Sequence, residues 1–217
     1  MKSGMILVFV NFEGCAEDVN AHSFLSGARL EKFRRVVTGE GKIQNLCAEA
    51  ACLLAVHFSG QKIQRDMYEY RENGKPFLRD GFNGYISIAH AGLSGACAWS
   101  HEPVGMDFER ADRNVIAVKR RILSPEEAEA PDEALLAKWC VKESYVKLTG
   151  EGLSRSFTGI TAKNGFVKDD GGGEARYRTG TANGHIWALS SLGDDTKVNV
   201  ISLTFQEALE KIAMALE

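Results

Sequence analysis

The chain of 217 residues lacks the features that mark the specialised protein classes. Proline is scarce, with 4 residues, and neither charge sign dominates, since Lys and Arg number 26 and Asp and Glu number 29. A formal net charge of -3 at pH 7 excludes a broad electrostatic surface for nucleic acid. A hydrophobic content of 44% and a charged content of 25% are typical of an ordinary globular protein.

Cysteine is present in a pattern that favours neither a disulfide framework nor a zinc site. There are 5 cysteines, an odd number, and no two of them form a CxxC pair: Cys15, Cys47, Cys52, Cys97 and Cys140. Disulfide-stapled domains and structural zinc sites both need paired cysteines at short, regular spacing. We therefore expect reduced thiols that are mostly buried.

Long hydrophobic runs are also missing. The run MILVFV, residues 5–10, is too short to span a membrane and is not followed by a small-residue cleavage site. We interpret it as a first β-strand and expect a cytoplasmic protein with no membrane partner. A chain of this length can bury a substantial core, either as one domain or as two small lobes.

The N-terminal half of the chain combines a helical segment with short strand-like segments. Residues 42–58, KIQNLCAEAACLLAVHF, are rich in helix formers with apolar side chains at helical spacing, which predicts a core helix. A turn-rich link around Asn73 and Gly74 follows. Three short segments bounded by turn residues, 84–92, 95–100 and 104–109, then predict an antiparallel meander.

The C-terminal half repeats this order. A helical region begins with SPEE at residues 124–127, resumes at about residue 132 and ends at Gly150-Glu151-Gly152. Strand-like segments occupy residues 157–205, and a last helix follows from residue 205. Because helix followed by strands occurs twice, the sequence predicts an α+β protein with two lobes of similar size.

The segment VGMDFE, residues 104–109, carries two carboxylates on one side of a predicted strand. Side chains two residues apart on a strand point to the same face, so Asp107 and Glu109 lie side by side. Taken alone, this pattern is more typical of a half-exposed strand with a solvated acidic face.

The segment KWCVKESYVKLTGEGL, residues 138–153, places charge inside the apolar stripe of a helix. At about 100° per residue, Glu143 and Lys147 fall in one sector with the apolar residues Leu135, Leu136, Trp139, Cys140 and Val146. A surface ion pair at this spacing would lie opposite the stripe. An ionised side chain that faces a core costs several kcal/mol unless it is paired or bound to metal, so Glu143 needs a compensating partner.

A divalent cation shared by Glu143, Asp107 and Glu109 would supply that partner. Ligation by oxygen alone, without His or Cys, suits Mg²⁺ or Mn²⁺ rather than zinc. Such sites keep positions open for substrate phosphate, and the chain offers basic groups that suit phosphate: Arg29, Lys32, Arg34, Arg35, Lys75 and His90. Alone, a charge run is more often a solvated helix face, and a single His is more often a packing residue.

Five motifs together carry a family resemblance. GKPFL, ISIAHAG, VGMDFE, SPEE and KWCVKESYVKLTGEGL resemble, in order and spacing, successive motifs of the surfactin-type 4′-phosphopantetheinyl transferases. The resemblance extends from about Arg29 to Leu153. It implies an α+β fold of two pseudo-twofold-related lobes, each a small antiparallel sheet packed with helices. We place these lobes at residues 1–104 and 105–217, with the active site between them.

The resemblance also implies roles for individual residues. It makes Asp107, Glu109 and Glu143 the ligands of Mg²⁺, in agreement with the helical argument. It assigns coenzyme A contacts to five residues: Arg29 and Lys32 near the nucleotide 3′-phosphate, Lys75 and Pro76 in the loop that flanks the adenine, and His90 at a phosphate.

Two further residues match catalytic positions of the family. Lys147 corresponds to a lysine that reaches the pyrophosphate, and Glu127 to a glutamate sometimes proposed as a base. Glu127 has an equally good structural explanation, because Ser124, Pro125 and Glu127 form a capping box worth roughly 1 kcal/mol. Both explanations of Glu127 stay open at the level of sequence.

The chain departs from the family pattern at two positions. Gln44 stands where the family commonly has an arginine early in the core helix, and Ala89 stands where it has a serine before the histidine. Both departures concern phosphate contacts, so they either weaken coenzyme A binding or shift that work to Arg34, Arg35 or Asn45. Neither affects the three acidic residues.

The resemblance implies a Mg²⁺-dependent transfer of the 4′-phosphopantetheine arm from coenzyme A to a serine of an apo acyl or peptidyl carrier protein. The other product is adenosine 3′,5′-bisphosphate, and the enzyme is expected to be a monomer. Two alternatives use the same residues. One is a metal-dependent nucleotide pyrophosphohydrolase with water as acceptor; the other is a coenzyme A-binding homologue without catalysis, motivated by Gln44 and Ala89.

Overall fold

Two β-sheets and a small hairpin form the framework of the computed structural model, which describes residues 4–12, 23–152, 155–193 and 197–216. The strands of the first sheet, in spatial order, are β11 (Val198–Thr204), β1 (Met5–Asn11), β5 (Ser94–Ser100) and β4 (Tyr85–Ala91). Those of the second are β6 (Val104–Arg110), β10 (His185–Ser191), β9 (Glu174–Ala182), β8 (Phe166–Asp169) and β7 (Ile160–Lys163). The hairpin consists of β2 (Tyr68–Tyr70) and β3 (Pro76–Leu78).

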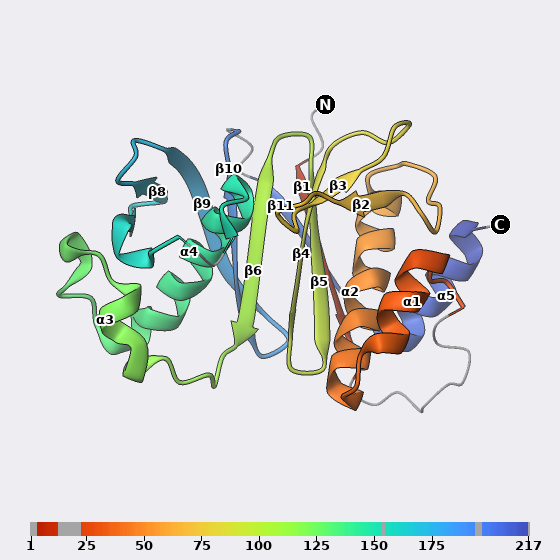
Figure 1. The fold of residues 1–217 in the computed structure, drawn as a ribbon, viewed down its shortest axis with the longest axis horizontal. Helices are drawn as coiled ribbons and strands as arrows, with labels where there is room; N and C mark the ends of the chain where they lie inside the picture. The colour runs from red at the N-terminus through yellow and green to blue at the C-terminus, as the bar shows by residue number, and fades with distance from the viewer. Residues whose placement is uncertain (1–3, 13–22, 153–154, 194–196, 217) are drawn as a thin grey trace.

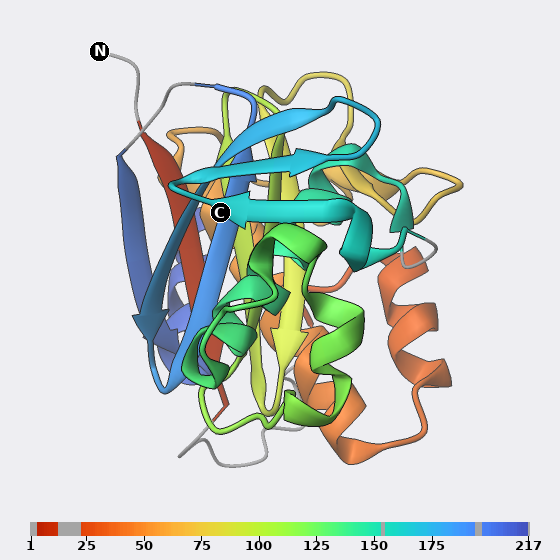
Figure 2. The same cartoon turned by 90° about the vertical axis from the view of Figure 1, so that its left-hand side faces the viewer.

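Helices cover the outer faces of both sheets, and the inner faces of the sheets pack on each other (Figure 1). On the first sheet lie α2 (Gly39–Phe58) and α5 (Phe205–Leu216), with α1 (Gly27–Arg35) outside α2; on the second lie α3 (Lys119–Ile122) and α4 (Leu135–Thr149). Figure 2 is turned so that α3 and α4 lie in front of the strands. The predicted α+β class, with small sheets packed against helices, is confirmed. One strand pair, β1 with β11, is parallel, and the other pairs are antiparallel.

Strand β1 is apolar on both faces because both faces are buried. Ile6, Val8 and Val10 pack toward the core around α2, whereas the alternate residues Met5, Leu7 and Phe9 pack between the sheets. The uninterrupted run MILVFV is therefore a core strand, as predicted, and its lack of alternation follows from burial on two sides.

Each of the two long helices approaches its sheet at a glycine. A Cβ built on Gly95 of β5 would lie 2.1 Å from the backbone nitrogen of Ala48 in α2. A Cβ built on Gly105 of β6 would lie 1.9 Å from the carbonyl oxygen of Ser144 in α4. Glycine is thus required at both contacts, because any other residue would push the helix away from the strand.

The predicted meander is correct for β4 and β5 but wrong for the third segment. β5 pairs with β4 on one edge and β1 on the other, so it has no free edge for β6. β6 instead pairs with β10 in the second sheet. A buried side chain joins β6 to β4 across the two sheets, since the N–H of Met106 donates to Ser87 Oγ at 2.9 Å.

Several other segments differ in detail from the predictions. The turn-rich link around Asn73 contains the β2–β3 hairpin, and the segment SPEE forms only a 3₁₀ turn (Pro125–Glu127) before α4. β11 and α5, assigned by sequence to the C-terminal lobe, pack instead with β1 and α2 of the N-terminal half. β11 is the parallel partner of β1, although the two strands are about 190 residues apart, and the order of segments in the sequence does not reveal this pairing. The boundary after residue 104 and the pseudo-twofold relation stay predictions.

The cysteines match the expectation of buried thiols where the structure describes them. Cys47, Cys52, Cys97 and Cys140 are buried and form no disulfide within the described residues, and Cys15 lies outside those residues. Among the described helices, none combines the length and the hydropathy that a membrane span requires.

The contact at Gly105 generates a test of the fold. We expect Gly105→Ala to lower the free energy of unfolding by about 3 kcal/mol or more, because its methyl group meets helix backbone that has no room to move. Urea denaturation would measure the change. Gly39→Ala is the matched control: nothing lies within 4 Å of its added Cβ, so stability should stay the same or rise by up to about 1 kcal/mol. Equal effects of the two substitutions would contradict the close contact.

Candidate active site

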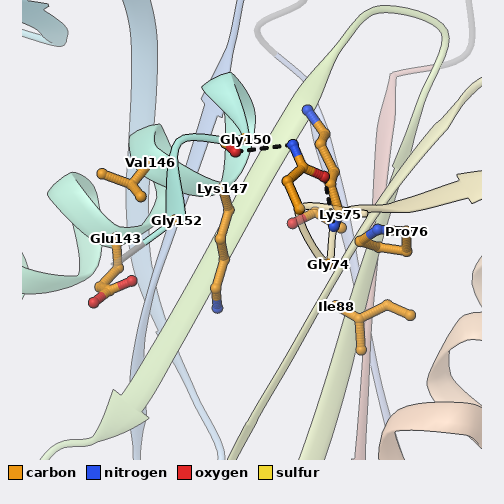
Figure 3. A pocket seen from close by; sticks show the side chains of 11 residues that line it. Gly74, Lys75, Pro76, Ile88, Glu143, Val146, Lys147, Gly150 and Gly152 are labelled. Carbon is orange, nitrogen blue, oxygen red and sulfur yellow. Dashed lines mark hydrogen bonds between the residues drawn. The ribbon is translucent and has the colours of Figure 1, made fainter. Parts of the chain in front are cut away.

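A pocket of about 290 Å³ lies between the β2–β3 turn and helix α4. Lys75 and Pro76 line it from the turn, and Glu143 and Lys147 line it from the helix (Figure 3). Lys147 extends from α4 toward the strands, and Glu143 lies one turn earlier on the same side of the helix. Four of the residues predicted from sequence, from segments far apart in the chain, therefore share one cavity.

Asp107 and Glu109 lie on β6 beside this pocket, and each contacts a cation. Lys147 Nζ donates to Asp107 Oδ1 at 2.7 Å, and Arg113 pairs with Glu109. The other oxygen of Asp107, Oδ2, is buried and has no hydrogen-bond partner among the described residues. Since a buried carboxylate oxygen without a partner is costly, Asp107 retains an unsatisfied acceptor at the site.

Of these three acids, Glu143 has no hydrogen-bonded or ion-paired partner among the described residues. The residue is 7% exposed. Burial, then the negative charges of Asp107 and Glu109, raise the pKa of Glu143 to about 7, although Lys147 opposes the shift. Burial and the charge of Asp107 also raise the pKa of Glu109. The three acids are thus electrostatically coupled and lack sufficient positive charge.

The donor set fits a hard divalent cation, although the side chains are not gathered around a single point. No three His, Cys, Asp or Glu side chains of the described residues are close enough to hold a metal ion. Two of the acids are turned toward Lys147 and Arg113 instead. Three oxygen ligands, a buried acceptor without a partner and an excess of negative charge are nevertheless the chemistry that Mg²⁺ or Mn²⁺ prefers.

Two lysines and a histidine lie close to one another near the acids. His90, at the end of β4, has a lowered pKa, first from partial desolvation and then from the positive charges of Lys147 and Lys32. These three groups belong to β4, α4 and α1, so only the tertiary structure brings them within electrostatic range. A cluster of this kind favours an anionic ligand such as phosphate.

Arg29 does not lie with this cluster as a free cation. It is 8% exposed; its guanidinium donates to Glu49 Oε1 at 3.0 Å and to the carbonyl oxygen of Tyr68 at 2.6 Å. The guanidinium carbon also lies 3.2 Å from the centre of the Tyr68 ring. Arg29 therefore joins α1 to α2 and β2, whereas Lys32, one turn later, is exposed above the ring of Tyr70.

Glu127 is not brought to the pocket either. Its side chain is 2% exposed, and four donors reach its two oxygens: Lys138 Nζ at 2.8 Å, Lys142 Nζ at 2.5 Å, the N–H of Ser124 at 3.0 Å and the N–H of Ala162 at 2.9 Å. Burial alone would raise the pKa of Glu127, but these hydrogen bonds lower it to about 2. The geometry is that of a structural carboxylate, and a catalytic role stays a prediction.

Lys142 is the charged residue that sequence reasoning missed. It is fully buried in α4, next to Glu143, and donates to Glu127 and to the carbonyl oxygens of Ile122 and Phe157. The apolar stripe did not include it because α4 is buried on most of its circumference. The sequence did hold a signal for Lys142, because this helix also carries Glu143 and Lys147 among its apolar residues.

The two departures from the family pattern have clear positions. Gln44 Nε2 donates to the carbonyl oxygen of Gly92 at 3.0 Å, so it supports the turn after His90. Ala89 is 4% exposed and packs between the sheets. Of the proposed substitutes, Arg34 is exposed and paired with Glu31, and Asn45 donates to the backbone of Gly41.

Comparisons with known proteins agree with the resemblance noted from the motifs. Residues 103–201 match the model of the 4′-phosphopantetheinyl transferase superfamily. The chain is 28% identical over 163 residues to 4′-phosphopantetheinyl transferase psf-1 of Bacillus pumilus, covering 69% of this chain and 65% of that protein. It is 31% identical over 149 residues to a 4′-phosphopantetheinyl transferase of Bacillus subtilis, covering 65% of this chain and 62% of the relative. It is 28% identical over 141 residues to 4′-phosphopantetheinyl transferase Sfp of Bacillus subtilis (strain 168), covering 61% and 63%. The matches thus span slightly less than two thirds of each relative.

The environment of Glu127 predicts a pH-dependent contribution to stability. Since its pKa falls from 4.5 to about 2 on folding, the contribution is complete above about pH 4.5 and is lost as the pH falls toward 2. We expect the free energy of unfolding of wild type to exceed that of Glu127→Gln by roughly 3 kcal/mol at pH 6. This difference should shrink as the pH falls below 4.5. Urea denaturation at several pH values would measure it. The exposed neighbour Glu126 provides the control, because Glu126→Gln should show no such difference; a difference for Glu127→Gln independent of pH would contradict the assignment.

Arg29 and Lys32 should differ in their effect on stability. Arg29→Met leaves Glu49 buried without its cation, and we expect a loss of about 3 kcal/mol in the free energy of unfolding. Lys32→Met removes only an exposed charge and its contact with Tyr70, so the loss should stay below about 1 kcal/mol. Chemical denaturation of both variants checks this. If Arg29→Met were as stable as wild type, the structural role of Arg29 would be refuted and the predicted contact of Arg29 with coenzyme A would again be favoured.

Proposed function

Because residues 103–201 match the model of the 4′-phosphopantetheinyl transferase superfamily, we propose that the chain transfers the 4′-phosphopantetheine arm of coenzyme A to a serine of an apo acyl or peptidyl carrier protein. The observation that carries the proposal is the shared pocket, in which Glu143 and Lys147 of one helix face Lys75 and Pro76 of a distant turn. Adenosine 3′,5′-bisphosphate is the second product. The protein is proposed to act in the cytoplasm as a monomer.

Asp107, Glu109 and Glu143 are the groups proposed to hold Mg²⁺ or Mn²⁺. Support comes from the unsatisfied Oδ2 of Asp107 and from the raised pKa of Glu143, both of which a cation would relieve. When bound, such a metal would neutralise charge that builds on the pyrophosphate during transfer. The chain's own residues contribute position: the strand β6 and the helix α4 hold the three carboxylates within electrostatic reach of each other.

Lys147, His90 and Lys32 are proposed to bind the phosphates of coenzyme A. Lys147, which extends into the pocket, would neutralise the departing phosphate, while His90 and Lys32 would bind the remaining phosphate oxygens. A serine hydroxyl must also lose its proton. We assign assistance in that step to Glu109, whose pKa is raised, rather than to Glu127, whose oxygens are occupied by four donors.

Two alternatives predict different reactions. A nucleotide pyrophosphohydrolase would release adenosine 3′,5′-bisphosphate from coenzyme A and Mg²⁺ without any protein acceptor. A non-catalytic homologue would bind coenzyme A and add no mass to any apo carrier. The presence of both Glu143 and Lys147 in the pocket favours the transferase over the non-catalytic homologue.

Removing Glu143 tests the proposed metal site. We expect Glu143→Ala to reduce transfer at least a hundredfold, because one of three metal ligands is lost, while the melting temperature stays the same or rises. No loss of stability is expected, since Glu143 has no ion pair within the described residues and its burial is unfavourable. Intact-mass measurement of a panel of apo carriers after incubation with coenzyme A and Mg²⁺ would report the transfer. Glu126→Ala, at an exposed glutamate, is the control, and near-normal transfer by Glu143→Ala would refute the ligand assignment.

A further inference from the structure

The C-terminal end of α4 is capped by side chains from a distant part of the chain. The last carbonyl groups of a helix have no partner within the helix and must find one elsewhere. In α4, Val146 O accepts the N–H of Gly150 at 2.8 Å, whereas Leu148 O and Gly150 O lie beyond the reach of the helix's own amides. The groups that bond to these two oxygens come from the β2–β3 turn, more than 70 residues earlier.

Asn73 connects the turn to the helix through both ends of its side-chain amide. Its Nδ2 donates to Gly150 O at 2.9 Å, and its Oδ1 accepts the N–H of Lys75 at 3.2 Å. The first bond reaches across to α4, and the second fixes the turn that presents Lys75. Lys75 Nζ in turn donates to Leu148 O. The pair of residues thus forms a bridge from the turn to the last turn of α4.

The close fit around Gly150 shows that the Asn73 side chain packs directly against the backbone at the end of α4. Gly150 has a left-handed backbone with φ of 79°, and a Cβ added there would lie 2.8 Å from Asn73 Nδ2. Glycine therefore serves two purposes, since it ends the helix and admits the Asn73 side chain.

The bridge spans the pocket that holds the candidate site. Asn73 and Gly150 both line this pocket, and Lys147 and Glu143 lie one and two turns before Gly150 on α4. A shift of the helix end would change both the width of the pocket and the position of Lys147. Asn73 itself is exposed and lies in a turn, so its loss would leave the hydrophobic cores intact.

We propose that Asn73 is a positioning residue: by holding Gly150 against the β2–β3 turn, it sets the pocket in which coenzyme A binds. The inference rests on the proposed function, which supplies the ligand. Asn73 acts through α4 and is not assigned any contact with the reacting atoms.

The test uses Asn73→Asp in the full chain. The aspartate keeps the acceptor for the N–H of Lys75 but replaces the donor to Gly150 O with a repelling oxygen. We expect the KM for coenzyme A to rise about fivefold, the factor that one ordinary hydrogen bond is worth, with kcat within twofold of wild type. Amide hydrogen exchange of residues 146–150 should be faster in the variant.

The matched control is Asn114→Asp. Asn114 Oδ1 also accepts a backbone N–H, that of Ile116 at 2.9 Å, and no bond from its Nδ2 is seen within the described residues. The control should therefore leave the KM and the exchange of residues 146–150 unchanged. Asn73→Ala, which removes both bonds of Asn73, should raise the KM at least as much as Asn73→Asp.

Each outcome separates the bridge from a general effect on folding. The proposal is overturned if the KM of Asn73→Asp stays within twofold of wild type, or if Vmax falls with the folded fraction while the KM is unchanged. It is also overturned if Asn114→Asp gives the same shift. Should wild type transfer nothing to any carrier, the proposed function fails, yet hydrogen exchange still decides the bridge: unchanged exchange at residues 146–150 rejects it.

Discussion

Contact between helix α4 and strand β6 determines where the charges of the candidate site lie. The helix backbone lies so close to β6 that only glycine fits at residue 105. Asp107, two residues along the strand, is thereby brought beside Lys147 and into electrostatic contact with Glu143. The pocket and its charged groups depend on this close packing of α4 on β6, because α4 supplies Glu143 and Lys147 to the pocket. The C-terminal end of α4 also forms the contact with the β2–β3 turn.

The same helix carries two neighbouring buried charges, Lys142 and Glu143, whose surroundings differ. Lys142 and Glu127 of the preceding 3₁₀ turn compensate each other, together with Lys138 and backbone groups, so the Glu127 carboxylate stays ionised well below its ordinary pKa. Glu143, only one residue from Lys142, has no comparable set of donors, and its pKa rises. A complete network is expected of a structural ion pair, whereas an incomplete one is expected where a ligand supplies the missing charge. This contrast distinguishes the structural glutamate from the candidate ligand.

Much of the site could be predicted from local patterns. The alternation in VGMDFE correctly indicated a strand with Asp107 and Glu109 on one side, and the helical spacing correctly indicated that Glu143 faces inward. The role of Arg29 could not be predicted, because Glu49 and Tyr68 lie far away in sequence and occupy its guanidinium. Neither could the course of β6 after β5: a strand's partner depends on which sheet edges are free, and β1 had already occupied that edge of β5.

The sequence by itself determined the α+β class, the secondary-structure type of the main segments and the family resemblance, because these follow from periodicity, turn residues and short motifs. Only the tertiary structure decided which charges are compensated and which are not. It also decided that the last strand and helix pack beside the first strand, and that Asn73 reaches the end of α4. The physical reason is that the cost of a buried charge depends on every group that folding brings within a few ångströms, and most of these groups are distant in the chain.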